Sequence, residues 1–243
     1  MRFALAVLAL LAGCQNAPGG GGPACALPET PVILNQSGDP HGPDGRLLQV
    51  WDIVDDPVLW SEASPEGAYA DFVSQVAELR LETDPVKLLE RSPTPNNRLI
   101  AVHADEWIRP AGCLEKLLTG YQHARIGVFD APTEFASVVM RSPDGSRLRI
   151  YYYTINQDGI GRASPIIDPA RADIARGWTM ELVLHPHVFH PGQPELDGLV
   201  APSAPDADLA YNLLGVGLKQ SWITNGVHTV TIPAEAFGLF RRE

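Results

Sequence analysis

The stretch Trp178-Thr-Met-Glu-Leu-Val-Leu-His-Pro-His187 decides how the second half of this 243-residue chain folds. From Met180 to Leu184 apolar residues occupy every second position, the period of a β-strand that buries one side. Pro186 has no N–H to give to a neighbouring strand, so it predicts the end of the strand or a sheet edge. We therefore expect a strand over Trp178–His185, with histidines at its end.

Three of the seven histidines of the chain lie here, at His185, His187 and His190. Side chains two positions apart on an extended segment point to the same side, and neutral imidazoles are common zinc ligands. Asp206, brought in from the next element, would supply a third ligand. The cluster predicts a metal site that uses either His185 with His187 or His187 with His190.

The regions around this strand favour a mixed α/β domain, in which helices pack against a sheet. Further strands are expected at Phe135–Arg141, Arg147–Ile155, Gln220–Thr224 and Val227–Ile232. The last two flank Asn225-Gly226, a pair typical of a type I′ hairpin turn. A helix is expected over Asp206–Leu214.

The first half of the chain is less regular. Strands are expected at Leu47–Val54 and Leu99–His103, and helices at Pro65–Arg80, Asp84–Glu90 and Ala111–Gln122. Ser92-Pro-Thr-Pro-Asn-Asn97 is expected to interrupt the chain. The acidic residues of this half lack metal-ligand spacing, so residues 28–125 are assigned to the globular domain without a function.

Each candidate residue also has a plain structural interpretation. Ser203-Ala-Pro-Asp206 alone resembles a helix capping box, with Asp in place of the usual Glu or Gln. His185 and His187 could be exposed polar residues at a strand end, and Glu134 alone is almost uninformative. Only the combination of these residues in order points to chemistry.

That order resembles the signature of the JAMM (MPN-type) metalloproteases. In that family a Glu on one strand is followed by His-x-His-Pro at a later strand end, and then by Ser-x-x-Asp at a helix start. The similarity extends from about residue 130 to residue 235. The chain departs from the pattern at Pro186 and Val188, and fifteen residues separate His187 from Ser203, more than the family's usual spacing. An insertion in a loop is tolerated at little cost.

The resemblance implies a JAMM/cytidine-deaminase-like core within residues 126–243, a mixed β-sheet with flanking helices. It implies a zinc-dependent hydrolase of peptide or isopeptide bonds. The implied metal ligands, with His190 as the alternative histidine, are His185, His187 and Asp206. The implied catalytic residues are Glu134, which transfers protons, and Ser203, which donates a hydrogen bond to the oxyanion.

Three other functions remain open, and one of them is a surface lipoprotein that binds a partner through residues 28–125. The departures at Pro186 and Val188 favour a catalytically inactive JAMM-like module that serves as a binding or scaffold lipoprotein. A cupin-type metal site, in which a Glu closely follows His-x-His, is disfavoured because Glu195 comes too late in the sequence.

The start of the chain reads as an export signal. Residues 1–13 have one basic residue, a short apolar run and a small-residue site, as in a signal peptide. Leu11-Ala-Gly-Cys14 resembles the lipobox of bacterial lipoproteins, which implies that Cys14 becomes lipidated and anchors the chain in the membrane. Residues 14–27 form a Gly/Pro-rich tether. We expect a lipoprotein of the cell envelope, in the outer membrane and facing the periplasm or the cell surface.

Cys25 and Cys113 are the other two cysteines. In an oxidising, exported compartment we expect them to pair as a disulfide, with two buried free thiols as the alternative. The formal net charge of −11 argues against nucleic acid as a partner, because such binding depends on Lys and Arg at the phosphates.

Overall fold

The structure is a computed structural model that describes residues 24–28, 30–42, 44–157, 164–190 and 198–240. The strands are β1 (Val32–Ser37), β2 (Arg46–Val54), β3 (Ile108–Pro110), β4 (Phe135–Arg141), β5 (Arg147–Thr154), β6 (Thr179–Pro186), β7 (Gln220–Thr224) and β8 (His228–Pro233). The α-helices are α1 (Ala68–Glu78), α2 (Pro85–Arg91), α3 (Pro95–Val102), α4 (Ala104–Trp107), α5 (Cys113–Ile126), α6 (Ser164–Ile174) and α7 (Ala204–Leu213). Short 3₁₀ helices are η1 (Pro57–Trp60), η2 (Leu214–Val216) and η3 (Ala234–Phe240).

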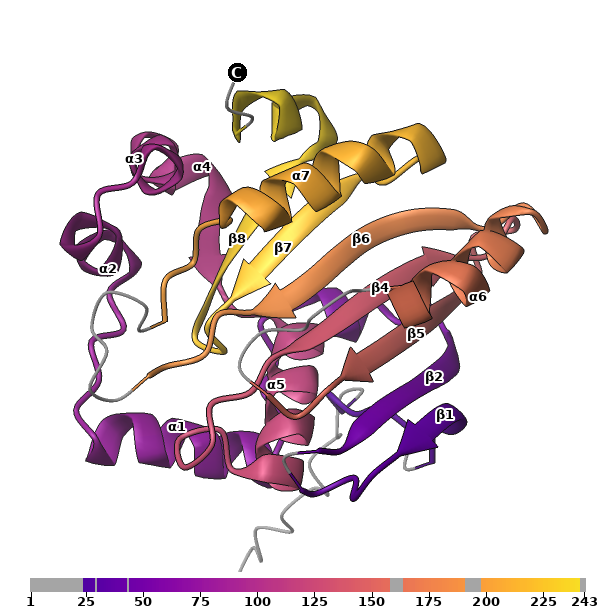
Figure 1. The fold of residues 1–243 in the computed structure, drawn as a ribbon, viewed down its shortest axis with the longest axis horizontal. Helices are drawn as coiled ribbons and strands as arrows, with labels where there is room; N and C mark the ends of the chain where they lie inside the picture. Colours follow the sequence, from indigo (N-terminus) through magenta and orange to yellow (C-terminus); the bar gives the residue numbers. More distant parts are fainter. Residues whose placement is uncertain (1–23, 29, 43, 158–163, 191–197, 241–243) are drawn as a thin grey trace, which may run out of the picture.

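Within the described residues, eight strands form one mixed sheet in the order β1-β2-β5-β4-β6-β7-β8-β3 (Figure 1). Strands β6 and β7 run parallel, and the other neighbouring pairs are antiparallel. A parallel pair needs a crossover, and α7 lies in the connection between β6 and β7. The expected α/β class with a mixed sheet and flanking helices is therefore confirmed.

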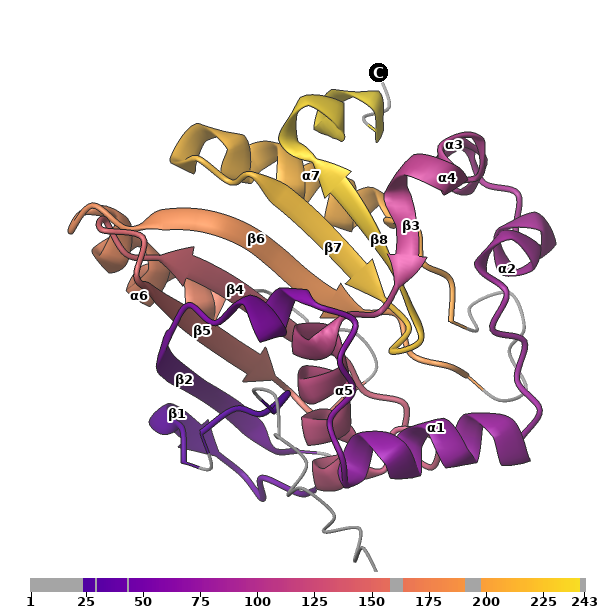
Figure 2. The ribbon, with the colours of Figure 1, turned by 180° about the vertical axis from the view of Figure 1, so that it is seen from behind.

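Helices cover both faces of the sheet. In Figure 1, α6 and α7 lie in front of it, and their buried residues join the core that contains Met180 and Val183 of β6. Figure 2 shows the opposite face, which α5 covers with α1 beside it. Leu182 and Leu184 of β6 face this second core. Successive residues of β6 thus point into two different layers, which places His185 on the α7 side.

The first half of the chain belongs to the same sheet as the second. Strand β2 pairs with β5 from Leu47 to Val54, and β3 adds an edge strand beside β8. A disulfide joins Cys25 to Cys113, the first residue of α5, with the two Cα atoms 5.7 Å apart. Residues 28–125 therefore supply strands and a covering layer to the fold that carries the histidines.

Most of the regular second half follows the sequence prediction. Strands β4, β5 and β6 lie within two residues of their expected bounds, and β6 ends at Pro186. The expected helix at Asp206–Leu214 is α7. In the first half β2, α1, α2 and α5 coincide with predicted elements, with α1 and α5 starting later than expected.

The predicted strand at Leu99–His103 is wrong, because these residues belong to the end of helix α3. Thr94 caps this helix: its side chain accepts a hydrogen bond from the backbone N–H of Asn97, over 3.1 Å. Pro95 occupies the first turn, where its missing N–H leaves no bond unmade. The Thr-Pro pair that was expected to interrupt the chain is a helix start.

The Asn225-Gly226 hairpin is present, but its turn is not type I′. Gly226 has φ of 86°, whereas Asn225 does not have the positive φ that type I′ requires. The Asn225 side chain instead accepts hydrogen bonds from the N–H groups of Val227 and His228, over 2.9 and 2.8 Å. The side chain thus closes the turn together with the backbone hydrogen bond from the N–H of Asn225 to the carbonyl of His228, over 3.1 Å.

No helix in the described part of the chain combines the length and apolar character needed to cross a bilayer. The expected signal peptide, the lipidation site Cys14 and most of the tether lie outside the described residues. Glu195, in the connection between His187 and Ser203, also lies outside them.

Candidate metal centre

The centre lies where β6 ends and α7 begins. The chain continues in register for one residue beyond β6, because the N–H of His187 donates to the carbonyl of Thr224 on β7 over 2.8 Å. His185 and His187 remain on one side of this extended segment. The side chain of His185 is buried and that of His187 is partly buried, so the interpretation as exposed strand-end residues is wrong.

Helix α7 starts with a full capping box. The Ser203 hydroxyl accepts a hydrogen bond from the N–H of Asp206, and the Asp206 carboxylate accepts one from the N–H of Ser203, over 2.8 Å. The hydroxyl of Ser203 also donates to Oδ2 of Asp206, over 2.5 Å. The capping interpretation is thus confirmed, and it holds the carboxylate in a fixed orientation.

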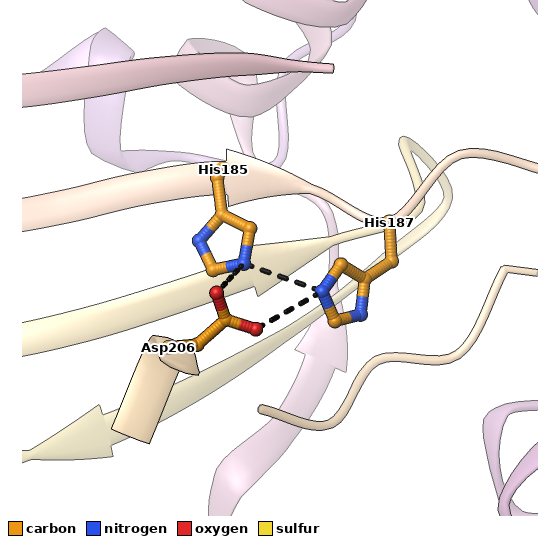
Figure 3. Close-up of side chains that lie close together, drawn as sticks. All are labelled: His185, His187 and Asp206. Atoms are coloured by element: carbon orange, nitrogen blue, oxygen red, sulfur yellow. Dashed lines mark hydrogen bonds and ion pairs between the residues drawn. The ribbon is translucent and has the colours of Figure 1, made fainter. Parts of the chain in front are cut away.

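The same carboxylate meets both histidines (Figure 3). Oδ1 of Asp206 lies 3.3 Å from Nε2 of His185, and Oδ2 lies 3.3 Å from Nε2 of His187. The two Nε2 atoms are themselves 3.3 Å apart. One ligand atom from each residue lies within 4.8 Å of the others, so this group could hold a metal ion.

A backbone carbonyl fixes the orientation of the His187 ring on its Nδ1 side. Its Nδ1 lies 2.7 Å from the carbonyl oxygen of Leu199. A carbonyl only accepts, so Nδ1 carries the hydrogen and the neutral ring presents the lone pair of Nε2 to Asp206. Backbone carbonyls hold metal-binding histidines in the same way.

The electrostatics of the cluster favour the binding of a cation or of an extra proton. Burial lowers the pKa of His187, but the hydrogen bond and charge of Asp206, with the charge of Glu134, outweigh it and raise that pKa above its usual value. Burial raises the pKa of Asp206, but both histidines outweigh it and hold the pKa well below the usual range. A lone pair and a carboxylate face each other, and a positive charge between them satisfies both.

A cavity of about 310 Å³ opens beside His187. Glu134 lines it from the residue before β4, and its backbone carbonyl accepts a hydrogen bond from the Thr154 hydroxyl, over 2.9 Å. Ser203 lines it from the start of α7. His190 also lines the cavity and is buried, but within the described residues it is not part of the three-residue group.

The wall of the cavity formed by Ser92–Asn97 was not anticipated. Asn96 donates from Nδ2 to the carbonyl of Pro202 over 2.8 Å, which ties the start of α3 to the residue before Ser203. Asn225 has a related part: its Nδ2 donates to the carbonyl of Gly198 over 3.0 Å, next to Leu199. Neither contact has a sequence signal, because each joins segments that are far apart in the chain.

No protein-family model, curated protein or solved structure matches this chain. The fold is therefore described by its own topology, a mixed eight-stranded sheet with a His-His-Asp group at the end of β6.

Proposed function

We propose that this chain is a zinc-dependent hydrolase of peptide or isopeptide bonds with a JAMM-like core. The observation that carries the proposal is the common position of a potential metal-binding group and a carboxylate. His185, His187 and Asp206 lie within ligand distance of one another, and Glu134 faces the same cavity beside His187.

The ligand atoms fit zinc better than the hard cations. Two imidazole nitrogens and one carboxylate form a ligand set found in catalytic zinc sites, where three protein ligands leave a fourth position open. Magnesium and calcium instead prefer oxygen ligands alone. When bound, zinc supplies Lewis acidity and lowers the pKa of water to about 7.

Glu134 is the proposed acid and base. Glu134 lines the cavity beside His187, and its charge is one of the causes that raise the pKa of that ring. In hydrolysis it takes the proton of the attacking water and delivers it to the amine that leaves. The hydrogen bond from Thr154 to the backbone of Glu134 holds this residue at the cavity rim.

Ser203 has two roles in this proposal, one toward the metal ligand Asp206 and one toward the substrate. Its hydroxyl donates to Asp206 and so keeps the carboxylate turned toward the histidines. It also lines the cavity, so rotation about its Cα–Cβ bond would offer the hydroxyl to an oxyanion in the transition state.

Metal analysis of the purified protein tests the proposal directly. We expect about one zinc ion per chain, lost in His185→Ala and Asp206→Ala and kept in Glu134→Gln and His190→Ala. If zinc stays bound in His185→Ala and is lost in His190→Ala, then His190 is the metal ligand in place of His185. A folded chain that binds no zinc would remove the hydrolase proposal.

Activity separates the hydrolase from an inactive scaffold. With a fluorogenic peptide library and a set of isopeptide-linked dipeptides, we expect the zinc-loaded protein to cleave at least one substrate. Glu134→Gln should lower that rate by about 10²- to 10⁴-fold with zinc content unchanged, the usual contribution of a general acid–base. Zinc binding without cleavage of any substrate would favour the scaffold.

We also propose that the chain is anchored in the cell envelope through lipidated Cys14. The support is the Leu11-Ala-Gly-Cys14 sequence and the Gly/Pro-rich segment after it. In a bacterial host the protein should sediment with membranes, and Cys14→Ser should release it. Equal membrane binding by both forms would contradict the anchor.

A further inference from the structure

A second cavity lies on the opposite face of the sheet from the metal centre. Its volume is about 300 Å³, near the lower end of the range for small-molecule sites. It is formed near the beginning of β6 and β7, beside η1, with Trp60 and Trp222 in its wall. We call it the tryptophan groove. We propose that the tryptophan groove binds a neutral saccharide.

Two tryptophan rings form the aromatic part of the groove. The rings of Trp60 and Trp222 meet edge to face, with centroids 6.0 Å apart and planes at 89°. Trp222 is buried and has Arg109 over its ring, 4.5 Å from the centroid. Trp60 is partly exposed, with Arg141 5.9 Å from its ring centroid, and it lines the groove. The C–H faces of a sugar ring are apolar and pack on indole rings, while the hydroxyls at the ring edge stay free for hydrogen bonds.

The polar groups around the rings are held in place before any ligand arrives. The indole N–H of Trp60 donates to Asp55 over 2.8 Å, and that of Trp222 donates to Gln220 over 2.7 Å. Asp55 also pairs with Arg141. Side chains fixed in this way lose little conformational entropy on binding.

The charges of the groove are already paired, which decides against an ionic ligand. Arg141 contacts Asp55 and Glu181, with its Nε 3.5 Å from Oε1 of Glu181. Lys219 lies beside the groove and pairs with the same Glu181 oxygen, over 2.6 Å. A charged ligand would have to displace one of these partners, whereas a neutral ligand would not.

Unused hydrogen-bonding atoms of both kinds remain. Among the described residues no hydrogen bond uses Nε2 of Gln220, Nη2 of Arg141 or Oε2 of Glu181. The first two are donors and the third is an acceptor. A sugar hydroxyl donates and accepts, so neighbouring hydroxyls on one ring suit this mixture better than an all-donor or all-acceptor ligand.

Titration of the full chain with neutral and anionic oligosaccharides tests the inference. The neutral probes are chitotetraose, cellotetraose and maltotetraose, and tetragalacturonate is the anionic comparison. Binding is measured by tryptophan fluorescence and by calorimetry. We expect at least one neutral probe to bind. Trp60→Ala and Gln220→Ala should each weaken it by about tenfold, equal to 1.4 kcal/mol.

The matched controls are Trp178→Ala and Gln36→Ala. Trp178 is also a partly exposed tryptophan, with Arg149 4.3 Å from its ring, but it packs against the core on the other face of the sheet and does not line the groove. Circular dichroism checks that each variant is folded, and the exposed Gln220 keeps the test open if Trp60→Ala fails to fold.

Binding that the groove variants weaken and the controls do not would support the inference. No binding of any neutral probe, equal losses in groove and control variants, or a preference for tetragalacturonate would each overturn it. The saccharide-binding measurements do not depend on zinc content or peptide cleavage. Their outcome is therefore independent of the proposed hydrolase function.

Discussion

Two buried polar clusters lie on opposite faces of the sheet, and they differ in how their hydrogen-bond donors and acceptors are matched. On the α5 side, Gln122 donates to the Thr133 hydroxyl over 2.6 Å and accepts from the hydroxyl of Tyr152 and from Arg125. We call this set the amide network. On the α7 side, the metal cluster of His185, His187 and Asp206 brings lone pairs together.

The difference is one of balance between donors and acceptors. In the amide network every N–H or O–H of Gln122, Tyr152 and Arg125 that points inward finds an acceptor, so the network needs nothing further. In the metal cluster His187 gives its one hydrogen to Leu199 and turns a lone pair toward a carboxylate. Both clusters are buried, so burial does not distinguish them, whereas this balance does.

The largest effect is expected when the amide network is broken. Gln122→Leu takes the Gln122 amide away from Thr133 and Tyr152, while Arg125 keeps Asn156 and the carbonyl of Pro40. Each unsatisfied buried group costs about 1–3 kcal/mol. We expect a loss of about 3 kcal/mol in the free energy of unfolding, measured in urea, with zinc content unchanged. Gln36→Leu, on the exposed strand β1, is the control and should change stability little.

The corresponding change in the metal cluster should behave differently. His185→Leu in the metal-free protein removes one of the two rings that face Asp206 and leaves His187 beside the carboxylate, so we expect stability to change by about 1 kcal/mol or less. Zinc should no longer raise the melting temperature of this variant. A loss as large as that of Gln122→Leu would show that the two clusters follow the same rule.

A smaller effect on both properties is expected from Ser203→Ala. The helix loses a capping side chain, which costs about 1 kcal/mol. Asp206 also loses the hydroxyl that orients it, so zinc affinity should fall by about 10- to 100-fold, as for other supporting residues of metal sites. Ser203→Thr, which keeps the hydroxyl, should retain both properties. Unchanged zinc affinity in the Ala variant would mean that the hydroxyl only caps the helix.

The smallest effect is a change in pH dependence. The pKa of His187 is raised in the folded, metal-free chain, so its contribution to stability is complete below about pH 6.5, the unfolded value. That contribution is lost as the pH rises through the higher folded pKa. Asp206, whose pKa is lowered, already contributes fully above about pH 4 and does not change in this window.

Metal reverses the sign. Zinc requires unprotonated ligands, so the stability that it adds should grow as the pH rises over the same range. Urea titrations from pH 6 to 8, with chelator and with zinc, measure both slopes. His187→Gln should flatten the metal-free slope, and a slope that this change does not affect would assign it to another group.

The sequence predicted the parts of the fold that rest on local pattern. Alternation located β4, β5 and β6, and Asn225-Gly226 located the last hairpin. The strand prediction at Leu99–His103 failed because its apolar run is too short to distinguish strand from helix, and the Thr94 cap was read as an interruption. Strand β1 and helix α6 had no pattern strong enough to predict.

The same distinction between local pattern and long-range contact applies to the candidate site. The spacing of His185 and His187 predicted that the two rings would share a side, and Ser203-x-x-Asp206 predicted the helix start that carries the third member. The wall around Asn96 and the carbonyl of Leu199 behind His187 could not be predicted. Both depend on contacts between distant segments, which periodicity does not encode.

The double use of Asp206 affects how such chains change over evolution. The start of α7 requires Ser203 and Asp206 for its cap whether or not a metal is bound. A descendant that lost the proposed zinc function would therefore keep this pair, while His185 and His187 would be free to change. In a diverged chain the histidines, rather than the Ser-x-x-Asp sequence, are therefore the residues whose retention would indicate the proposed metal chemistry.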